Sequence, residues 1–175
     1  MKPIYEPKGK AKEYGDLAIN IYTGCPHRCY YCFAPNVLRR DREKFHTCVE
    51  PRKNIVEEVK KQLERENITD KLIHLCFTCD PYPTGYDTTA TREIIKLLKV
   101  SGNHVQILTK GDGSRDFDLL DENDWYGKDM VLTEEQAKQL AAFVSKNKPY
   151  NDRDIECMVA RALLYGNKVV INADW

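Results

Sequence analysis

Three cysteines lie within a span of eight residues, in the stretch YTGCPHRCYYCFAP that runs from residue 22 to residue 35. Cys25, Cys29 and Cys32 follow the spacing C-x3-C-x2-C. Thiolates this close in sequence are typical ligands of zinc ions and of iron–sulfur clusters. The chain holds seven cysteines, an odd number, and in a reducing compartment such clustering favours metal binding or catalysis over a disulfide framework.

Two kinds of metal site could use these thiols, and they differ in how they account for a fourth ligand. A structural zinc ion needs four tetrahedral ligands, so His27, His46 or Cys48 would have to complete the set. A second knuckle next to this loop, which such zinc sites usually have, is missing. A [4Fe–4S] cluster on three thiolates instead leaves one iron open, which is typical of a centre that binds substrate or cofactor directly.

With Tyr31 as the aromatic residue, the motif C-x3-C-x-aromatic-C after a short apolar stretch resembles the signature of the radical SAM (S-adenosylmethionine, AdoMet) superfamily. The resemblance implies that Cys25, Cys29 and Cys32 hold a [4Fe–4S] cluster whose remaining iron binds AdoMet. Reductive cleavage of AdoMet would give a 5′-deoxyadenosyl radical that abstracts hydrogen from a substrate not identified by the sequence. An external electron donor of the flavodoxin or ferredoxin type is the implied partner.

Two further stretches, FTCDPYP and ILTKG, resemble motifs of the spore photoproduct lyase-like branch of this superfamily. By that resemblance, Lys110 contacts the carboxylate end of AdoMet. Thr78 and the backbone around Asp80 contact its amino acid part, and Phe33 lies against the adenine. Cys79 is implied as the donor of a hydrogen atom to the product radical.

The elements that must position these residues alternate along the chain. Apolar runs predict buried strands, and apolar residues at helical spacing predict helices between them. In order, the prediction is a strand over 17–22, a helix opened by Pro51 and ended by Asn67, a strand over 72–77, a helix from Thr88 to Gly102 and a strand over 104–109. This alternation predicts a parallel sheet with the featured loops at the carboxyl ends of its strands.

The predicted fold is α/β: a partial, truncated radical SAM (β/α) barrel over residues 1–127, with an atypical helical C-terminal segment over 128–175. In that segment we expect a helix after the capping box of residues 133–136, a second helix over 152–165 and a final strand over 168–172. Motifs of the fourth and fifth barrel strands have no match. An open sheet edge after the third strand would favour a homodimer or a covering tail.

Composition is that of an ordinary globular protein: 175 residues, 42% hydrophobic and 31% charged, with a formal net charge of zero. No apolar run approaches the roughly 20 residues that a membrane span needs. The first 16 residues lack the apolar region of a secretory signal. We therefore expect a cytoplasmic protein with no membrane partner.

Other features raise alternatives. The basic segment RRDREK over residues 39–44 is interpreted first as solvated surface. Together with the lyase-like motifs it raises the alternative of a nucleic-acid-directed repair enzyme, whose phosphate binding would be salt-sensitive. A different alternative is a non-catalytic iron–sulfur or zinc-binding module derived from such an enzyme. Seven acidic residues over 112–129 are interpreted as solvated surface. Cys76, although it forms C-x2-C with Cys79, is interpreted as a small buried hydrophobe; Cys48 and Cys157 have no assigned role.

Overall fold

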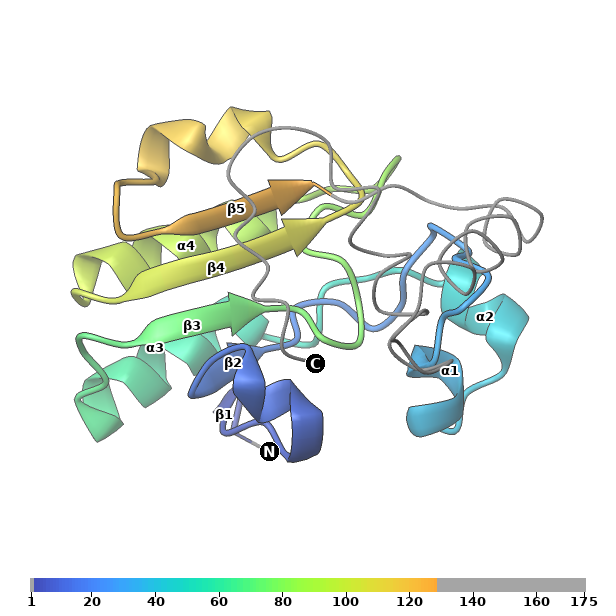
Figure 1. Ribbon diagram of the computed structural model, residues 1–175, viewed down its shortest axis with the longest axis horizontal. Helices are drawn as coiled ribbons and strands as arrows, with labels where there is room; N and C mark the ends of the chain where they lie inside the picture. The colour runs from blue at the N-terminus through green and yellow to red at the C-terminus, as the bar shows by residue number, and fades with distance from the viewer. Residues whose placement is uncertain (1, 129–175) are drawn as a thin grey trace, which may run out of the picture.

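The computed structural model describes residues 2–128, so the elements expected beyond residue 128 lie outside the described residues. The described chain forms a five-stranded sheet in the order β1-β2-β3-β4-β5 (Figure 1). β1 pairs antiparallel with β2, and all other neighbours pair in parallel. The strands are β1 (Ile4–Tyr5), β2 (Leu17–Ile19), β3 (Leu72–Leu75), β4 (His104–Thr109) and β5 (Trp125–Lys128).

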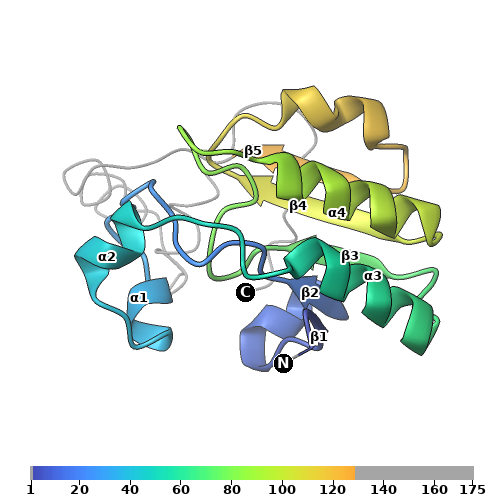
Figure 2. The same cartoon turned by 180° about the vertical axis from the view of Figure 1, so that it is seen from behind.

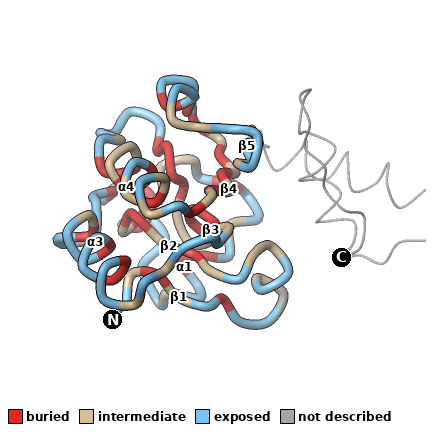
Figure 3. The backbone as a smooth tube through the Cα atoms, turned by 90° about the vertical axis from the view of Figure 1, so that its left-hand side faces the viewer, coloured by how far each residue is buried: buried red, intermediate tan, exposed pale blue. Residues whose placement is uncertain are grey.

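Two long helices, α3 (Ile55–Glu66) and α4 (Thr89–Val100), cover one face of the sheet (Figure 2). Each repeats apolar residues at helical spacing, so one stripe of each helix is buried against the strands. Buried segments therefore concentrate along the strands and the inner sides of the helices (Figure 3). The hydrophobic core between these helices and the sheet includes Ile19, Val59, Leu63, Ile73, Leu75, Ile94, Ile95, Leu98 and Ile107.

Pro51 does not open a helix, contrary to the expectation. It lies opposite Tyr22 in an isolated antiparallel bridge, and the next residue, Arg52, donates its backbone N–H to the Ile21 carbonyl at 2.8 Å. α3 begins four residues later, after Asn54, which adopts the left-handed conformation at φ 54°. Proline is tolerated at such a bridge because it sits at an edge where no ladder donor is required.

Two strands were not expected from the sequence. β1 has only two residues and is fixed by Gln62 of α3, whose amide bonds both the N–H and the C=O of Ile4 at 2.9 and 2.8 Å. A 3₁₀ helix, η1 (Gly9–Glu13), then leads into β2. β5 pairs with β4 along its whole length. The edge of β4 that was expected to be open is therefore covered by the chain itself.

The acidic stretch over residues 112–129 is not simply a solvated surface. Within the 3₁₀ helix η2 (Ser114–Leu119), Asp116 is fully buried and pairs with Arg92 of α4 at 2.7 Å. It also accepts bonds from Arg115 and from the Tyr82 hydroxyl. Burial alone would raise the pKa of Asp116, but these partners outweigh it and lower the pKa. This ion pair joins η2 to α4 and holds the connection between β4 and β5 in place.

The connections that follow β2, β3 and β4 gather at the carboxyl edge of the sheet, on the right in Figure 1. The first, over residues 20–54, contains the short helices α1 (Ala34–Val37) and α2 (Arg42–Thr47). Residues 2–128 thus form a mixed α/β unit with a mostly parallel sheet, which agrees with the expected fold class. None of its helices has the length and apolar character that crossing a membrane would require.

Candidate active site

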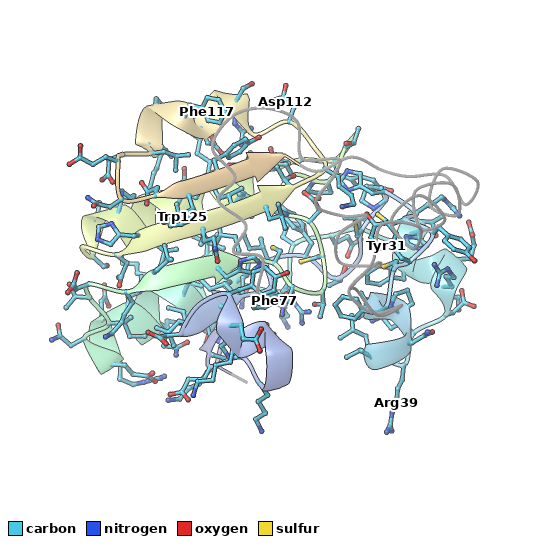
Figure 4. All side chains as sticks on the ribbon, in the orientation of Figure 1. Tyr31, Arg39, Phe77, Asp112, Phe117 and Trp125 are labelled. Carbon is cyan, nitrogen blue, oxygen red and sulfur yellow. The ribbon has the colours of Figure 1, made fainter. Side chains whose placement is uncertain are left out.

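The three-cysteine loop begins just beyond β2, where the chain stays buried through Ile21 and Tyr22. The Tyr22 hydroxyl shares a 2.8 Å hydrogen bond with the buried Thr91 hydroxyl of α4. Tyr22 and the bridge to Pro51 therefore anchor the loop on the core before the first cysteine is reached. Figure 4 shows sulfur atoms near Tyr31, beyond the carboxyl ends of the strands.

Helix α2 fixes the start of the loop from the side. The Cys25 N–H donates to the Phe45 carbonyl at 3.1 Å, and Nδ1 of the buried His46 bonds the Cys25 carbonyl at 2.7 Å. Gly24 packs so closely here that an added Cβ would collide with the Phe45 carbonyl oxygen. The backbone of α2 thus sets where the first thiol lies.

Gly24→Ala is expected to destabilise the protein by about 1–3 kcal/mol, because the new methyl group would push α2 away from the loop. Urea unfolding of the metal-free protein measures this cost. Gly15→Ala is the matched control, since a Cβ there would meet its nearest atom at an ordinary 3.6 Å. Equal stability of the two variants would contradict the close contact between α2 and the loop.

Arginines of the basic segment hold the remainder of the loop. Arg42 donates to the carbonyl oxygens of Cys29, Tyr30 and Cys32, each at 3.3 Å. Arg40 donates to the carbonyl of Thr23 at the beginning of the loop. Both guanidinium groups bond backbone oxygens of the cysteine loop, whereas Arg39 extends away from the domain (Figure 4).

The three sulfurs occupy a poorly hydrated position. Cys29 is buried, Cys25 and Cys32 are partly buried, and burial raises the pKa of the Cys25 thiol to about 12. A thiolate at Cys25 therefore needs a compensating positive charge, which a metal centre supplies. The donor set of three sulfurs on one short loop fits an iron–sulfur cluster in its chemistry.

A mononuclear zinc site requires its ligand atoms to lie close together. Two thiolates on one zinc lie about 3.8 Å apart, as follows from tetrahedral geometry at 2.3 Å bonds. Within residues 2–128, the only three candidate ligand atoms within 4.8 Å of one another belong to His104, Asp121 and Asp124. Lys99 already bonds both of those carboxylates at 2.7 Å, so they form an ion-pair cluster remote from the cysteine loop.

Asp80 connects the cysteine loop to two other loops. Its buried carboxylate accepts hydrogen bonds from His27 Nδ1 at 3.2 Å and from the Lys110 N–H at 2.8 Å. The Thr109 hydroxyl and the Tyr82 N–H bond its other oxygen. Burial would raise the pKa of Asp80, but these donors outweigh it and lower the pKa. The carboxylate is therefore a structural hub that joins the loops following β2, β3 and β4.

His27 is the residue of this hub that sequence reasoning missed, because it was considered only as a zinc ligand. Its Nε2 accepts the Thr84 N–H at 3.3 Å, which leaves Nδ1 as the protonated nitrogen that donates to Asp80. Nδ1 also lies 3.6 Å from the Cys25 sulfur. The position of His27 between two cysteines of the motif was the available signal for this role.

Thr78, which was expected to contact a cofactor, lies in the loop that follows β3. Its Oγ1 is buried and has no hydrogen-bond partner within the described part of the chain. The Thr78 N–H is fixed at 2.9 Å by the amide oxygen of Asn20, a second residue that sequence reasoning missed. A buried hydroxyl without a partner costs free energy, so a polar ligand at this position would be stabilised.

Lys110 approaches the cysteine loop from the end of β4. Its ammonium nitrogen lies 5.6 Å from the centre of the Tyr31 ring, between the second and third cysteines. Phe33, expected to lie against an adenine, is more than half exposed at the beginning of α1. Cys79 is partly buried, and its Sγ accepts the Tyr22 N–H at 3.4 Å. The structure thus brings Thr78, Cys79 and Lys110 to the same sheet edge as the cysteine loop.

Comparison with protein families agrees with this arrangement. The family model described as the radical SAM superfamily matches residues 19–144, which include the cysteine loop and the loops after β3 and β4.

Curated relatives include an uncharacterized protein of Mycobacterium bovis and uncharacterized proteins from two strains of Mycobacterium tuberculosis. Each is 30% identical to this chain over 147 residues. The match covers 79% of this chain but only 40% of each relative, so the chain spans well under half of the length of these proteins. No solved structure matches the chain.

Proposed function

This chain belongs to the radical SAM superfamily, and we propose that Cys25, Cys29 and Cys32 hold a [4Fe–4S] cluster at which AdoMet binds. When bound, the cluster and AdoMet supply the radical that abstracts hydrogen from a substrate. The observation that supports this best is the Asp80 hub, because it joins the cysteine loop to both loops expected to bind AdoMet. An external one-electron donor is the expected partner.

The residues of the chain have separate parts in this proposal. The Thr78 hydroxyl would bond the amino acid part of AdoMet, which would satisfy a buried group that otherwise has no partner. The Lys110 ammonium would stabilise the carboxylate, since a cation beside a carboxylate makes a strong hydrogen bond. Phe33 offers an exposed aromatic face for the adenine. Asp80 and His27 would act by holding the loops in register.

Cys79 would give a hydrogen atom to the product radical, as in the lyase-like branch that the motifs after β3 and β4 resemble. Cys79 lies at the carboxyl edge of the sheet and is partly buried as a residue. Cys79→Ala would then leave AdoMet cleavage intact and alter only the product.

Lys110→Met is expected to weaken AdoMet binding by about tenfold, the loss of one charge-assisted hydrogen bond. Equilibrium dialysis of labelled AdoMet with the anaerobically reconstituted protein measures the change. Lys96→Met is the control, because Lys96 lies on the exposed side of α4 and pairs there with Glu93 at 2.8 Å. Equal affinities of the two variants would contradict a role for Lys110 at the carboxylate.

The function itself is tested by reducing the reconstituted protein with dithionite in the presence of AdoMet. We expect 5′-deoxyadenosine and methionine to form in equal amounts. A protein that holds the cluster but forms no 5′-deoxyadenosine would instead be a non-catalytic iron–sulfur module. Salt-sensitive DNA binding by the same protein would favour a repair substrate.

A further inference from the structure

Two cysteines outside the three-cysteine motif lie together at the carboxyl end of β3. Cys76 directly follows the strand and is buried, whereas Cys79 is partly exposed. Cys76 adopts the left-handed conformation at φ 74°, which is strained for a residue other than glycine. Its N–H is bonded to the Ile19 carbonyl at 2.8 Å. The chain thus keeps an unfavourable backbone conformation at the first cysteine of a C-x2-C pair.

The two side chains face each other. A side-chain hydrogen bond links the Cys76 thiol and the Cys79 sulfur. The Cys79 sulfur also accepts the Tyr22 N–H at 3.4 Å. The C-x2-C spacing also places both cysteines in the turn that directly follows β3.

The environments of the two thiols shift their pKa values in opposite directions. Burial would raise the pKa of Cys79, but the bonds from Cys76 and Tyr22 and the charge of Arg52 outweigh it and lower the pKa. Burial raises the pKa of Cys76 well above its usual value. The Nε atom of Arg52 is itself buried without a hydrogen-bond partner among residues 2–128. Cys79 is thus the less buried thiol and the one whose thiolate form is favoured, and Cys76 is the shielded one.

We propose that Cys76 and Cys79 form a redox-active dithiol that low-molecular-weight disulfides oxidise to an intramolecular disulfide. The Cys79 thiolate attacks one sulfur of the small disulfide, forms a mixed disulfide and releases one thiolate. The Cys76 thiol then loses its proton to solvent and attacks the Cys79 sulfur, which releases the second thiolate. Two protein thiols are oxidised, and one small disulfide is reduced to two thiols.

This site is separate from the cysteines assigned to the cluster and does not depend on AdoMet. Closing the disulfide would tie the end of β3 to the loop that contains Thr78 and Asp80. It would also remove the thiol hydrogen of Cys79. The oxidised chain would therefore keep its fold and its cysteine loop while losing the free thiol at the sheet edge.

The pair can be followed directly, because trypsin releases residues 72–92 as one peptide with no other cysteine. The full chain is incubated anaerobically with oxidised glutathione, and its remaining thiols are alkylated. After digestion, the mass of the peptide is measured by mass spectrometry. We expect it to be lighter by two hydrogen atoms and to escape alkylation. A peptide that keeps two alkylatable thiols, or that carries a lasting glutathione on Cys79, would overturn the proposal.

Variants separate the roles of the two thiols. In Cys76→Ser the mixed disulfide on Cys79 is expected to persist, because the resolving thiol is gone. In Cys79→Ser the buried Cys76 is expected to react with oxidised glutathione at least about tenfold more slowly than Cys79 does in Cys76→Ser. Equal reactivity of the two single thiols would contradict the assigned order.

The charge of Arg52 is expected to favour the Cys79 thiolate, and alkylation of Cys79 tests this expectation. Arg52→Gln is expected to slow iodoacetamide labelling of Cys79 by up to about tenfold at neutral pH, and Arg52→Lys to restore much of the rate. Both variants should show the wild-type rate at a pH where the thiol is fully ionised. A rate deficit that persists there would show a merely structural effect and overturn the role of Arg52. Because none of these readouts involves AdoMet, the dithiol can fail or succeed independently of the proposed function.

Discussion

Replacing any one of Cys25, Cys29 and Cys32 with alanine is expected to reduce the iron content of the anaerobically reconstituted protein from about four per chain to near background. Each thiolate would hold a different iron, so no remaining ligand on the loop can substitute for the one removed. Iron and sulfide assays, together with the brown absorbance of the cluster, measure the loss. The effect is expected to be at least tenfold, about the largest that a single substitution in this chain can produce.

Cys48→Ala is the matched control for these variants. Cys48 is exposed at the end of α2, close to the cysteine loop, and it was one of the residues that could have completed a zinc site. It should keep the full iron content. Loss of metal from Cys48→Ala equal to that from Cys25→Ala would contradict a three-cysteine centre and favour a four-ligand metal site.

Asp80→Asn is expected to lower the free energy of unfolding of the metal-free protein by about 3 kcal/mol. The amide would replace a carboxylate oxygen that accepts N–H groups with a nitrogen that cannot accept them. The cysteine loop would then no longer be joined through Asp80 to the loops that follow β3 and β4. Anaerobic urea unfolding measures the change, and cluster assembly should fail in parallel because the loops lose their register.

Asp118→Asn serves as the comparison for Asp80. Asp118 also pairs with an arginine, Arg92, at 2.6 Å, but its side chain is 57% exposed. Solvent screens such a pair, so its loss should have little effect on stability. If Asp80→Asn were no less stable than Asp118→Asn, the claim that Asp80 stabilises the fold by joining the three loops would be contradicted.

The same hub predicts how stability depends on pH. The folded protein lowers the pKa of Asp80 below that of the unfolded chain, which is about 3.9. The stabilisation is therefore fully present above the unfolded pKa and is lost as the pH falls through the folded pKa. Wild-type protein should lose stability more steeply than Asp80→Asn in acid. Parallel stability curves for the two proteins below about pH 5 would contradict this linkage.

The parts of the fold that repeat a simple pattern could be predicted from the sequence. The strand predicted over 104–109 is β4 within the same bounds, His104–Thr109, because a short segment rich in apolar and β-branched residues meets turn residues at both ends. The helix predicted from Thr88 agrees closely with α4. The cysteine loop follows the first parallel strand as expected, since Thr23 and Gly24 end the apolar run.

Features that depend on distant partners could not be predicted in this way. β1 exists because Gln62 bonds both backbone groups of Ile4, a contact across 58 residues with no local pattern. The burial of Asp116 depends on Arg92, and the role of Asp80 depends on His27 and Lys110. The assignments of Phe33, Thr78, Cys79 and Lys110 to AdoMet and substrate stay predictions.

The central claim is that AdoMet binds at the iron left open by a three-cysteine loop. It is tested most directly by electron–nuclear double resonance of the reduced, reconstituted protein with AdoMet isotopically labelled at its amino nitrogen. Hyperfine coupling between the cluster and that nitrogen is the predicted result. A fully assembled, reduced cluster that shows no such coupling at saturating AdoMet would contradict the account.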